Sequence, residues 1–575
     1  MKKLMLGNEA IARGVYEAGV TVAAAYPGTP STEITEFISK YEEVYAEWSP
    51  NEKVALEVAI GSSFGGARSV AAMKHVGLNV AADPLFTVAY TGINGGLVIF
   101  VADDPGMHSS QNEQDTRIIA RASHIPVLEP ADSSECRDFV IKGMVMSEAY
   151  DTPVIVRLTT RVAHSQSIVE LGERLAFSVK DYVKDIPKYV MTPGNAIKRH
   201  LAVEARMERL EKDSESLGLY KEENVDSPIG IITSGISYQY VKESNVCANI
   251  LKLDMVNPIP KAVIKAFAKK VEKLYVVEEL EPVIEEQVAA MGITVYGKAF
   301  FGKQGEITTR KVKALFELEL AKIGEVKQLP VRPPVLCPGC PHRSVYTVLK
   351  RLKARVMGDI GCYTLGSMAP HQAMDACVCM GASIGMAHGM EKARGIEDTQ
   401  KTVAIIGDST FMHSGVTGLI NVAYNQGVST IIIADNSTTG MTGHQDHAGT
   451  GKTLKGDIVA AIDLEKLCEA VGIKHVVTVN AYDMKAVQKT LKEEMARKAP
   501  SVVITKAPCK LIVKEKWEPF MIRKEKCTNC GACATLGCPA IQKGEKVTQI
   551  NHALCAGCGL CESVCTKGAI CKEGN

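Results

Sequence analysis

The segment Thr402-Val403-Ala404-Ile405-Ile406-Gly407-Asp408-Ser409 is an apolar run that ends in a glycine and two polar residues. A second segment, Thr430-Ile431-Ile432-Ile433-Ala434-Asp435-Asn436, has the same form. Short apolar runs that end in turn residues are typical of strands buried in a parallel sheet. Because ligands bind beyond the carboxyl ends of such strands, Asp408 and Asn436 are candidates for a binding site.

Helical and strand-like patterns alternate on both sides of these two strands, which favours an α/β fold with helices covering parallel sheets. The chain has 575 residues, too many for one hydrophobic core, so we expect several domains. The expected segments are an α/β domain at 1–190, a charged helical linker at 191–227, a second α/β domain at 228–330, a third at 331–515, and a cysteine-rich tail at 516–575.

The composition excludes several classes of function. The net charge is +1, so there is no electrostatic argument for binding nucleic acid or an acidic membrane surface. No apolar run reaches the roughly 18 residues that a membrane span needs. The first apolar stretch stops at Leu6, so we expect no signal peptide and a cytoplasmic location.

The tail concentrates nine of the chain's 18 cysteines between Cys527 and Cys571. Disulfides are rare in the cytosol, so such a density indicates metal. Each of two motifs holds three cysteines at spacing three and a remote fourth, and in two-cluster ferredoxins the fourth cysteine ligates the other 4Fe-4S cluster. The expected ligands are Cys527, Cys530, Cys533 and Cys565 for one cluster, and Cys555, Cys558, Cys561 and Cys538 for the other.

Zinc is the alternative for the tail, but zinc ribbons use paired cysteines rather than triples with a remote fourth. The first motif departs from the bacterial ferredoxin pattern. It has four residues, 534–537, before its last cysteine instead of three. This leaves a three-iron form of one cluster open.

The motif pair around Asp408 and Asn436 resembles the thiamine-diphosphate fingerprint, in which a Gly-Asp-Gly triplet precedes an Asn-Asn pair by a similar interval. Three further segments extend the likeness: Cys337 to Arg343, Gly358 to Gly366, and Met441 to Gln445. Together they look like the cofactor domain of the large subunit of indolepyruvate:ferredoxin oxidoreductases, a branch of the 2-oxoacid:ferredoxin oxidoreductases. The resemblance spans essentially the whole chain.

The resemblance implies a pyrimidine-binding domain at 1–190, a transketolase-C-terminal-like domain at 228–330, a thiamine-diphosphate domain at 331–515 and a two-cluster ferredoxin-like tail. It implies Mg²⁺ ligands at the side chains of Asp408 and Asn436 and the carbonyl of Thr438, oxygen ligands that suit this ion. Further cofactor-binding residues would be Gly361, Cys362, Gly407, Ser409 and Met441. The alternative for the Gly407-Asp408 pair alone is a plain strand-end turn.

The same resemblance implies a third 4Fe-4S cluster near the thiamine, held by Cys337, Cys340, Cys362 and Cys509. The alternative is that Cys337 and Cys340 are structural thiols and only the tail carries iron. Cys377 and Cys379 lie among small residues, and we expect them in the core.

The family also uses a glutamate that activates the cofactor by a hydrogen bond to its pyrimidine ring. Counting back nine positions from Gly61 gives Glu52, with Glu57 as the fallback. The turn from Tyr26 to Thr32 resembles the family's substrate turn, and Thr29 would hydrogen-bond the oxoacid. Arg117 is the expected cation for the substrate carboxylate, and Arg121 is its alternative.

The expected reaction is oxidative decarboxylation of aryl pyruvates with coenzyme A, giving aryl-acetyl-CoA, CO₂ and reduced ferredoxin. The family implies a separate smaller beta subunit and an α₂β₂ assembly, and the chemistry of the iron sites suggests an anaerobe's cytosol. The alternatives are another 2-oxoacid (pyruvate, 2-oxoglutarate or a branched-chain acid), a non-catalytic electron-transfer subunit, or a thiamine-dependent decarboxylase that needs no clusters.

Overall fold

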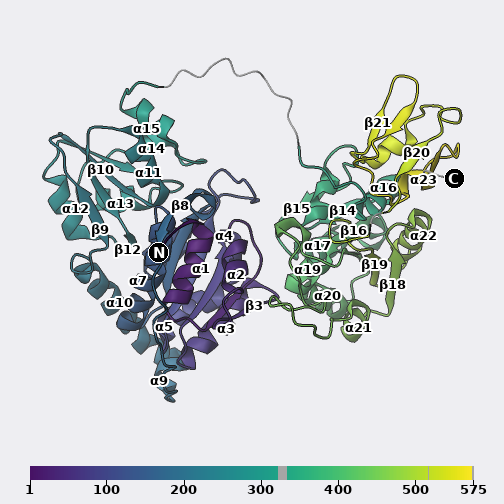
Figure 1. Cartoon of the computed structure of the whole chain (residues 1–575). Coiled ribbons are helices and arrows are strands. Elements are labelled where there is room, and N and C mark those ends of the chain that lie inside the picture. Colours follow the sequence, from purple (N-terminus) through teal and green to yellow (C-terminus); the bar gives the residue numbers. More distant parts are fainter. Residues whose placement is uncertain (321–332, 516, 573–575) are drawn as a thin grey trace. The chain divides into compact units, whose positions relative to one another are not determined.

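The structure is a computed structural model that describes residues 1–320, 333–515 and 517–572. The chain divides into two compact units, Met1–Lys327 and Gln328–Asn575 (Figure 1). The domain boundary expected at residue 330 lies outside the described residues. Among the described residues, no helix is both long and apolar enough to cross a membrane.

The first unit is organised by a seven-stranded sheet whose central strands are fully buried. Its strands in spatial order are β12 (Met255–Asn257), β6 (Val127–Leu128), β7 (Val154–Thr159), β5 (Leu97–Asp103), β4 (Ser69–Lys74), β2 (Val22–Ala25) and β3 (Tyr45–Trp48). Neighbouring strands are parallel except for β12, which pairs antiparallel with β6. The carboxyl ends of β2, β4 and β5 therefore meet at one edge of the sheet.

A second sheet in this unit has the order β13 (Lys273–Val277), β10 (Ile229–Ser234), β11 (Asn249–Leu253) and β9 (Tyr220–Glu223). Strand β12 follows β11 in the chain but joins the seven-stranded sheet, so the two α/β regions share a core. The segment expected as a linker contributes to this unit: α10 (Pro193–Asp213) buries Val203 and Leu210, and β9 completes the second sheet.

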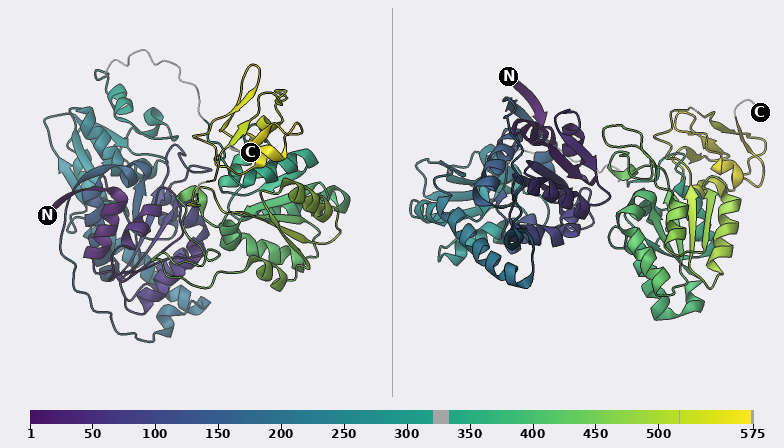
Figure 2. Two further views of the ribbon diagram at one scale, coloured as in Figure 1. Left: turned by 45° about the vertical axis from the view of Figure 1, so that its right-hand side comes forward. Right: turned by 90° about the horizontal axis from the view of Figure 1, so that it is seen from below.

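The second unit contains a six-stranded sheet in which every neighbouring pair is parallel. Its order is β15 (Ala376–Cys377), β14 (Arg355–Gly358), β16 (Thr402–Gly407), β17 (Thr430–Asp435), β19 (Ser501–Lys506) and β18 (His475–Asn480). Successive residues of β16 face opposite layers: Val403 and Ile405 pack with α16 (His342–Leu352) and α22 (Met484–Met495), while Ala404 and Ile406 pack with α17 (Ala382–Arg394) and α20 (Val416–Tyr424). Helices cover both faces of this sheet (Figure 2), which explains the unbroken apolar runs in the sequence.

The cysteine-rich tail has little core of its own. It consists of two antiparallel pairs, β20 (Phe520–Ile522) with β23 (Ile570–Lys572) and β21 (Ile541–Lys543) with β22 (Thr548–Ile550). A 3-10 turn, Ala532–Leu536, and a short helix, α23 (Leu560–Ser563), follow one strand of each pair. Its apolar residues Phe520, Leu536 and Leu560 join the core formed by α16 and α22, so the tail packs onto the sheet domain.

Candidate functional site

The three expected Mg²⁺ ligands meet at the carboxyl edge of the six-stranded sheet. Asp408 directly follows β16 and Asn436 directly follows β17, and these strands are adjacent and parallel. In the orientation where its nitrogen faces acceptors, the Asn436 carboxamide donates to Asp408 Oδ1 at 3.2 Å and to the Thr438 carbonyl at 2.8 Å. The backbone N–H of Ser437 donates to Asp408 Oδ2 at 2.9 Å.

The Asp408 carboxylate is buried, and burial raises its pKa. His447 opposes this shift, because its Nε2 lies 3.2 Å from Asp408 Oδ2. No sequence pattern pointed to His447. Within the described ranges, no group of three or more His, Cys, Asp or Glu side chains is placed to hold a single metal ion. The site at Asp408 is not such a group, because its oxygen atoms come from one carboxylate, one side-chain amide and one backbone carbonyl. Mg²⁺ accepts all three as ligands.

The other expected cofactor-binding residues lie around the same edge. Gly407 ends β16, and the Ser409 hydroxyl accepts a hydrogen bond from Thr439 at 2.8 Å. A Cβ added to Gly440 would stand 3.3 Å from Cys362 Sγ, so the loop that leads to Met441 passes close to Cys362. Gly361 precedes Cys362 at the end of the turn that follows β14.

The turn before Gly361 is fixed by Asp359, a fully buried residue that sequence reasoning did not assign a role. Asp359 Oδ1 accepts from the Gly381 N–H at 2.8 Å, and Oδ2 accepts from the Ser383 N–H at 3.0 Å. These bonds tie the turn to the start of α17, and they hold the segment containing Gly361 and Cys362 in place.

The four cysteines expected to hold a third cluster influence one another electrostatically. Burial, together with neighbouring Cys362 and Cys337, raises the pKa of Cys340 to about 12. Burial raises the pKa of Cys362 to about 11, with Cys509 and Cys337 as its neighbours. The Cys509 N–H donates to the Asn436 carbonyl at 2.8 Å, which places Cys509 beside the expected Mg²⁺ ligands.

Two further cysteines differ from expectation. Cys377 is only partly buried and Cys379 is exposed, so the prediction that both lie in the core is wrong. They occupy the edge strand β15 and the turn after it, where the sheet leaves one side uncovered.

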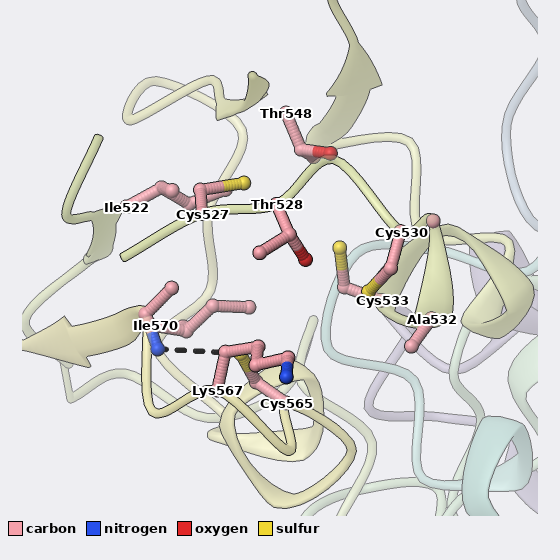
Figure 3. A pocket seen from close by; sticks show the side chains of 12 residues that line it. Ile522, Cys527, Thr528, Cys530, Ala532, Cys533, Thr548, Cys565, Lys567 and Ile570 are labelled. Atoms are coloured by element: carbon pink, nitrogen blue, oxygen red, sulfur yellow. Dashed lines mark hydrogen bonds between the residues drawn. The ribbon is translucent and has the colours of Figure 1, made fainter. Parts of the chain in front are cut away.

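In the tail, two cavities each gather four cysteines from both motifs. The first has an empty volume of about 340 Å³. Figure 3 shows the four cysteines that line it, Cys527, Cys530, Cys533 and Cys565. The second has an empty volume of about 410 Å³ and is lined by Cys538, Cys555, Cys558 and Cys561. Thiolates are the ligands of iron–sulfur clusters, so each cavity is lined by the four ligands that one cluster needs.

A buried arginine joins the tail to the sheet domain. Arg343 donates through Nη1 to the Leu536 carbonyl at 2.8 Å and through Nε to the Cys337 carbonyl at 3.1 Å. Arg343 and Gly339 also line the second cysteine cavity, so the Cys337-to-Arg343 element borders that cavity. The Cys337-to-Arg343 element is therefore in direct contact with the tail.

In the first unit, the two candidate glutamates have different environments. Glu52 is buried at the first turn of α3 (Glu52–Phe64), where the Asn51 side chain accepts from the Val54 N–H. A Cβ added to Gly77 would stand 2.5 Å from Glu52 Oε1, so only glycine leaves room for this carboxylate. Glu57 is exposed and pairs with Lys53 on the helix surface.

Arg117, the expected partner of the substrate carboxylate, is instead enclosed by the protein's own acids. Its side chain is 1% exposed and reaches Asp115 Oδ2 at 2.6 Å and Glu278 Oε2 at 2.7 Å. It also donates to the Glu279 carbonyl at 2.8 Å, and the two carboxylates raise its pKa despite burial. This arginine links the two α/β regions, and Arg121 is exposed on the last turn of α6 (Thr116–Ala122).

The expected substrate turn follows β2. Thr29 is partly buried there, and the turn is braced by the Ser31 hydroxyl, which donates to the Gly28 carbonyl at 2.8 Å. The Asn8 carboxamide donates to the Pro30 carbonyl at 2.8 Å. Both bonds fix the backbone on either side of Thr29.

Two domain profiles and several named relatives match this chain. The profile of the pyruvate flavodoxin/ferredoxin oxidoreductase thiamine-diphosphate-binding domain matches residues 13–212, and that of the C-terminal binding domain of thiamine pyrophosphate enzymes matches residues 359–505. Indolepyruvate oxidoreductase subunit IorA from Archaeoglobus fulgidus is 40% identical over 99% of this chain and 97% of its own length. The protein of the same name from Pyrococcus horikoshii gives the same three values.

Among solved structures, a 2-oxoglutarate:ferredoxin oxidoreductase from Magnetococcus marinus is 18% identical, with a TM-score of 0.45 over 55% of this chain and 65% of that chain. The identity to the IorA proteins extends over the whole length of both chains, and two thiamine diphosphate-binding profiles match separate regions. The chain therefore belongs to the IorA family of indolepyruvate oxidoreductase subunits, which are thiamine-diphosphate-dependent 2-oxoacid:ferredoxin oxidoreductases.

Proposed function

We propose that this chain is the catalytic subunit of an enzyme that oxidises aryl pyruvates, with indolepyruvate and phenylpyruvate as substrates. The balanced reaction converts the 2-oxoacid, coenzyme A and two oxidised ferredoxins into aryl-acetyl-CoA, CO₂, a proton and two reduced ferredoxins. The main support for the proposal is that one compact unit contains both a candidate Mg²⁺ site and two cysteine-lined cavities. Asp408, Asn436 and Thr438 converge at the sheet edge, and two cavities hold four cysteines each.

The residues at the sheet edge suit a diphosphate held through Mg²⁺. When bound, thiamine diphosphate supplies an electron sink for the carbon that loses CO₂. Asp408, Asn436 and the Thr438 carbonyl would hold the metal, and Gly407 and Ser409 would lie beside the diphosphate. Gly361, Cys362 and Met441 would contribute to the remaining cofactor contacts.

Two residues of the first unit take part in the proposed chemistry. Glu52 would hold a proton at the pyrimidine ring of the cofactor, because its carboxylate is buried and fixed at a helix start. Thr29 would donate a hydrogen bond to the 2-oxo oxygen of the substrate. Glu57 is the poorer candidate, since it is exposed and already paired with Lys53.

The cysteines would carry electrons away singly. Cys527, Cys530, Cys533 and Cys565 would hold one 4Fe-4S cluster, and Cys538, Cys555, Cys558 and Cys561 the other. Cys337, Cys340, Cys362 and Cys509 would hold a third, because they lie together beside the Mg²⁺ ligands.

The proposal includes a smaller beta subunit in an α₂β₂ assembly, a cytoplasmic location and free ferredoxin as the acceptor. The partner subunit is supported by the relatives named IorA, which are subunits of an oxidoreductase.

The test is turnover of the complex purified with its partner without oxygen, using a viologen dye as the acceptor. We expect dye reduction that requires coenzyme A and proceeds with indolepyruvate and phenylpyruvate. Glu52→Gln should abolish it, while the matched Glu57→Gln variant should keep it. Reduction with pyruvate or 2-oxoglutarate alone would overturn the aryl pyruvate assignment, and no reduction with any oxoacid would overturn the proposed function.

A further inference from the structure

Lys74 stands at the edge of the first sheet where the substrate turn begins. It is the last residue of β4, between β2, which leads into the Tyr26–Thr32 turn, and β5, which ends in Asp103. Ligands of open parallel sheets bind at this carboxyl edge. Only 8% of Lys74 is exposed, which is unusual for a lysine unless its charge is paired.

The Lys74 side chain lies directly beneath the substrate turn. A Cβ added to Gly28 would stand 3.3 Å from both Lys74 Cγ and Cδ, so Gly28 and the lysine stem are in contact. The ammonium donates one hydrogen bond, to the Ser109 carbonyl at 2.8 Å. An ammonium has three N–H donors, so this bond leaves capacity for a further acceptor.

Nearby acids do not neutralise this ammonium by contact. Among the described residues, no carboxylate comes within ion-pair distance of Lys74 Nζ, although Asp104 and Glu52 are its charged neighbours. Asp104 Oδ2 accepts from the Ser109 N–H and the Ser110 hydroxyl, both at 2.7 Å, and its Oδ1 accepts from Thr160 at 2.7 Å. Burial lowers the pKa of Lys74 to about 8, which reflects the cost of a charge without a contact partner.

We propose that Lys74 binds the carboxylate of the 2-oxoacid substrate, the role for which the buried and fully paired Arg117 is unsuited. The inference rests on the proposed function. A substrate carboxylate carries one negative charge, which suits one ammonium. Thr29 follows Gly28 on the turn that the Lys74 side chain contacts, so its hydroxyl would be available to the oxo group of the same substrate.

The test measures binding of an unreactive analogue directly, by calorimetry on the intact complex without oxygen. The probes are 3-phenyllactate, which keeps the carboxylate, and its methyl ester, which does not. We expect the wild type to bind the acid at least tenfold more tightly than the ester. Lys74→Met should bring the ratio of the two dissociation constants close to one, and Lys74→Arg should restore part of it. Lys40→Met, a matched change at an exposed lysine, should keep the wild-type ratio.

The pH dependence of the acid-to-ester binding ratio is a second test, and it does not require the Lys74→Met variant. The charged groups facing Lys74 are Asp104, Glu52 and His75. Lys74 is charged below its pKa, so the preference for the acid should fall as pH rises through about 8. Lys74→Arg should remove that fall, because arginine stays charged. An unchanged acid-to-ester ratio in Lys74→Met, or a pH-independent ratio in the wild type, would overturn the inference. Failure of the proposed function would appear separately, as absence of wild-type turnover.

Discussion

Replacing Arg117 with glutamine should destabilise the first unit rather than weaken substrate binding alone. The guanidinium contacts the carboxylates of Asp115 and Glu278, all three groups are almost fully buried, and the contacts join two α/β regions that are far apart in the sequence. Glutamine keeps part of the side-chain volume but removes the positive charge. Glu278 then loses its ion-pair partner, and Asp115 keeps only the more distant Arg157, at 3.9 Å.

The expected loss in the free energy of unfolding follows from the carboxylates that stay buried after the substitution. Removing one partner of a buried ion pair costs about 3–5 kcal/mol, because the other charge stays in a poorly solvated place. The first unit runs from Met1 to Lys327, and an unfolding entropy of ~2.1 cal/mol/K per residue gives a fall in Tm of ~1.5 °C for each kcal/mol. We therefore expect the Tm of Arg117→Gln to fall by roughly 4–7 °C. The deficit should shrink at acidic pH, because protonation of Asp115 and Glu278 removes the unpaired charges.

The assay is thermal unfolding of the intact complex, followed by calorimetry at two pH values. Arg121→Gln is the matched control on the same helix, and as an exposed change it should alter the free energy of unfolding by less than about 0.5 kcal/mol. A variant as stable as the wild type that has lost its affinity for 3-phenyllactate would refute the reasoning. It would return Arg117 to the role of substrate ligand.

Three further predictions concern single residues. Asp408→Asn should weaken binding of thiamine diphosphate with Mg²⁺ by more than the ~10–100-fold typical of an outer-shell partner, measured by calorimetric titration, and unchanged affinity would remove Asp408 from the metal site. Cys538→Ser should lose the iron of one cluster and the electron paramagnetic resonance signal of that cluster. The control variant Cys571→Ser should keep both, and equal iron contents in the two variants would contradict the assigned ligands. Burial raises the pKa of Glu279 to about 7 from an ordinary value near 4.5, so the first unit should lose stability as pH rises between these values, and Glu279→Gln should flatten that slope in a series of Tm measurements.

Sequence spacing predicted the parts of the site that depend on local order. Asp408 and Asn436 follow apolar runs, and the ends of adjacent parallel strands meet at one edge, so their proximity follows from the pattern. The cysteine sets behave in the same way. The spacing of the triples and the remote fourth cysteine predicted which four residues share a cavity, and the cavities contain those sets.

Sequence spacing did not reveal contacts made between distant segments. Strand β12 follows the second sheet in the chain yet pairs with β6, because its apolar residues complete the shared core. The role of Arg117 depends on Glu278, which lies 161 residues away. Lys74 contacts Gly28 and His447 contacts Asp408, and both contacts join segments that are distant in the sequence. Neither residue belongs to a motif that spacing could identify.

The most direct test of the central claim is a single turnover without ferredoxin or dye. The complex, loaded with thiamine diphosphate and Mg²⁺ in the absence of oxygen, is mixed with indolepyruvate and coenzyme A, and the visible absorbance of its clusters is followed. The account predicts bleaching of the clusters by indolepyruvate in the wild type. It predicts no bleaching in Glu52→Gln, although dithionite still reduces the clusters of that variant. Clusters that dithionite reduces in the wild type but indolepyruvate does not would contradict the account.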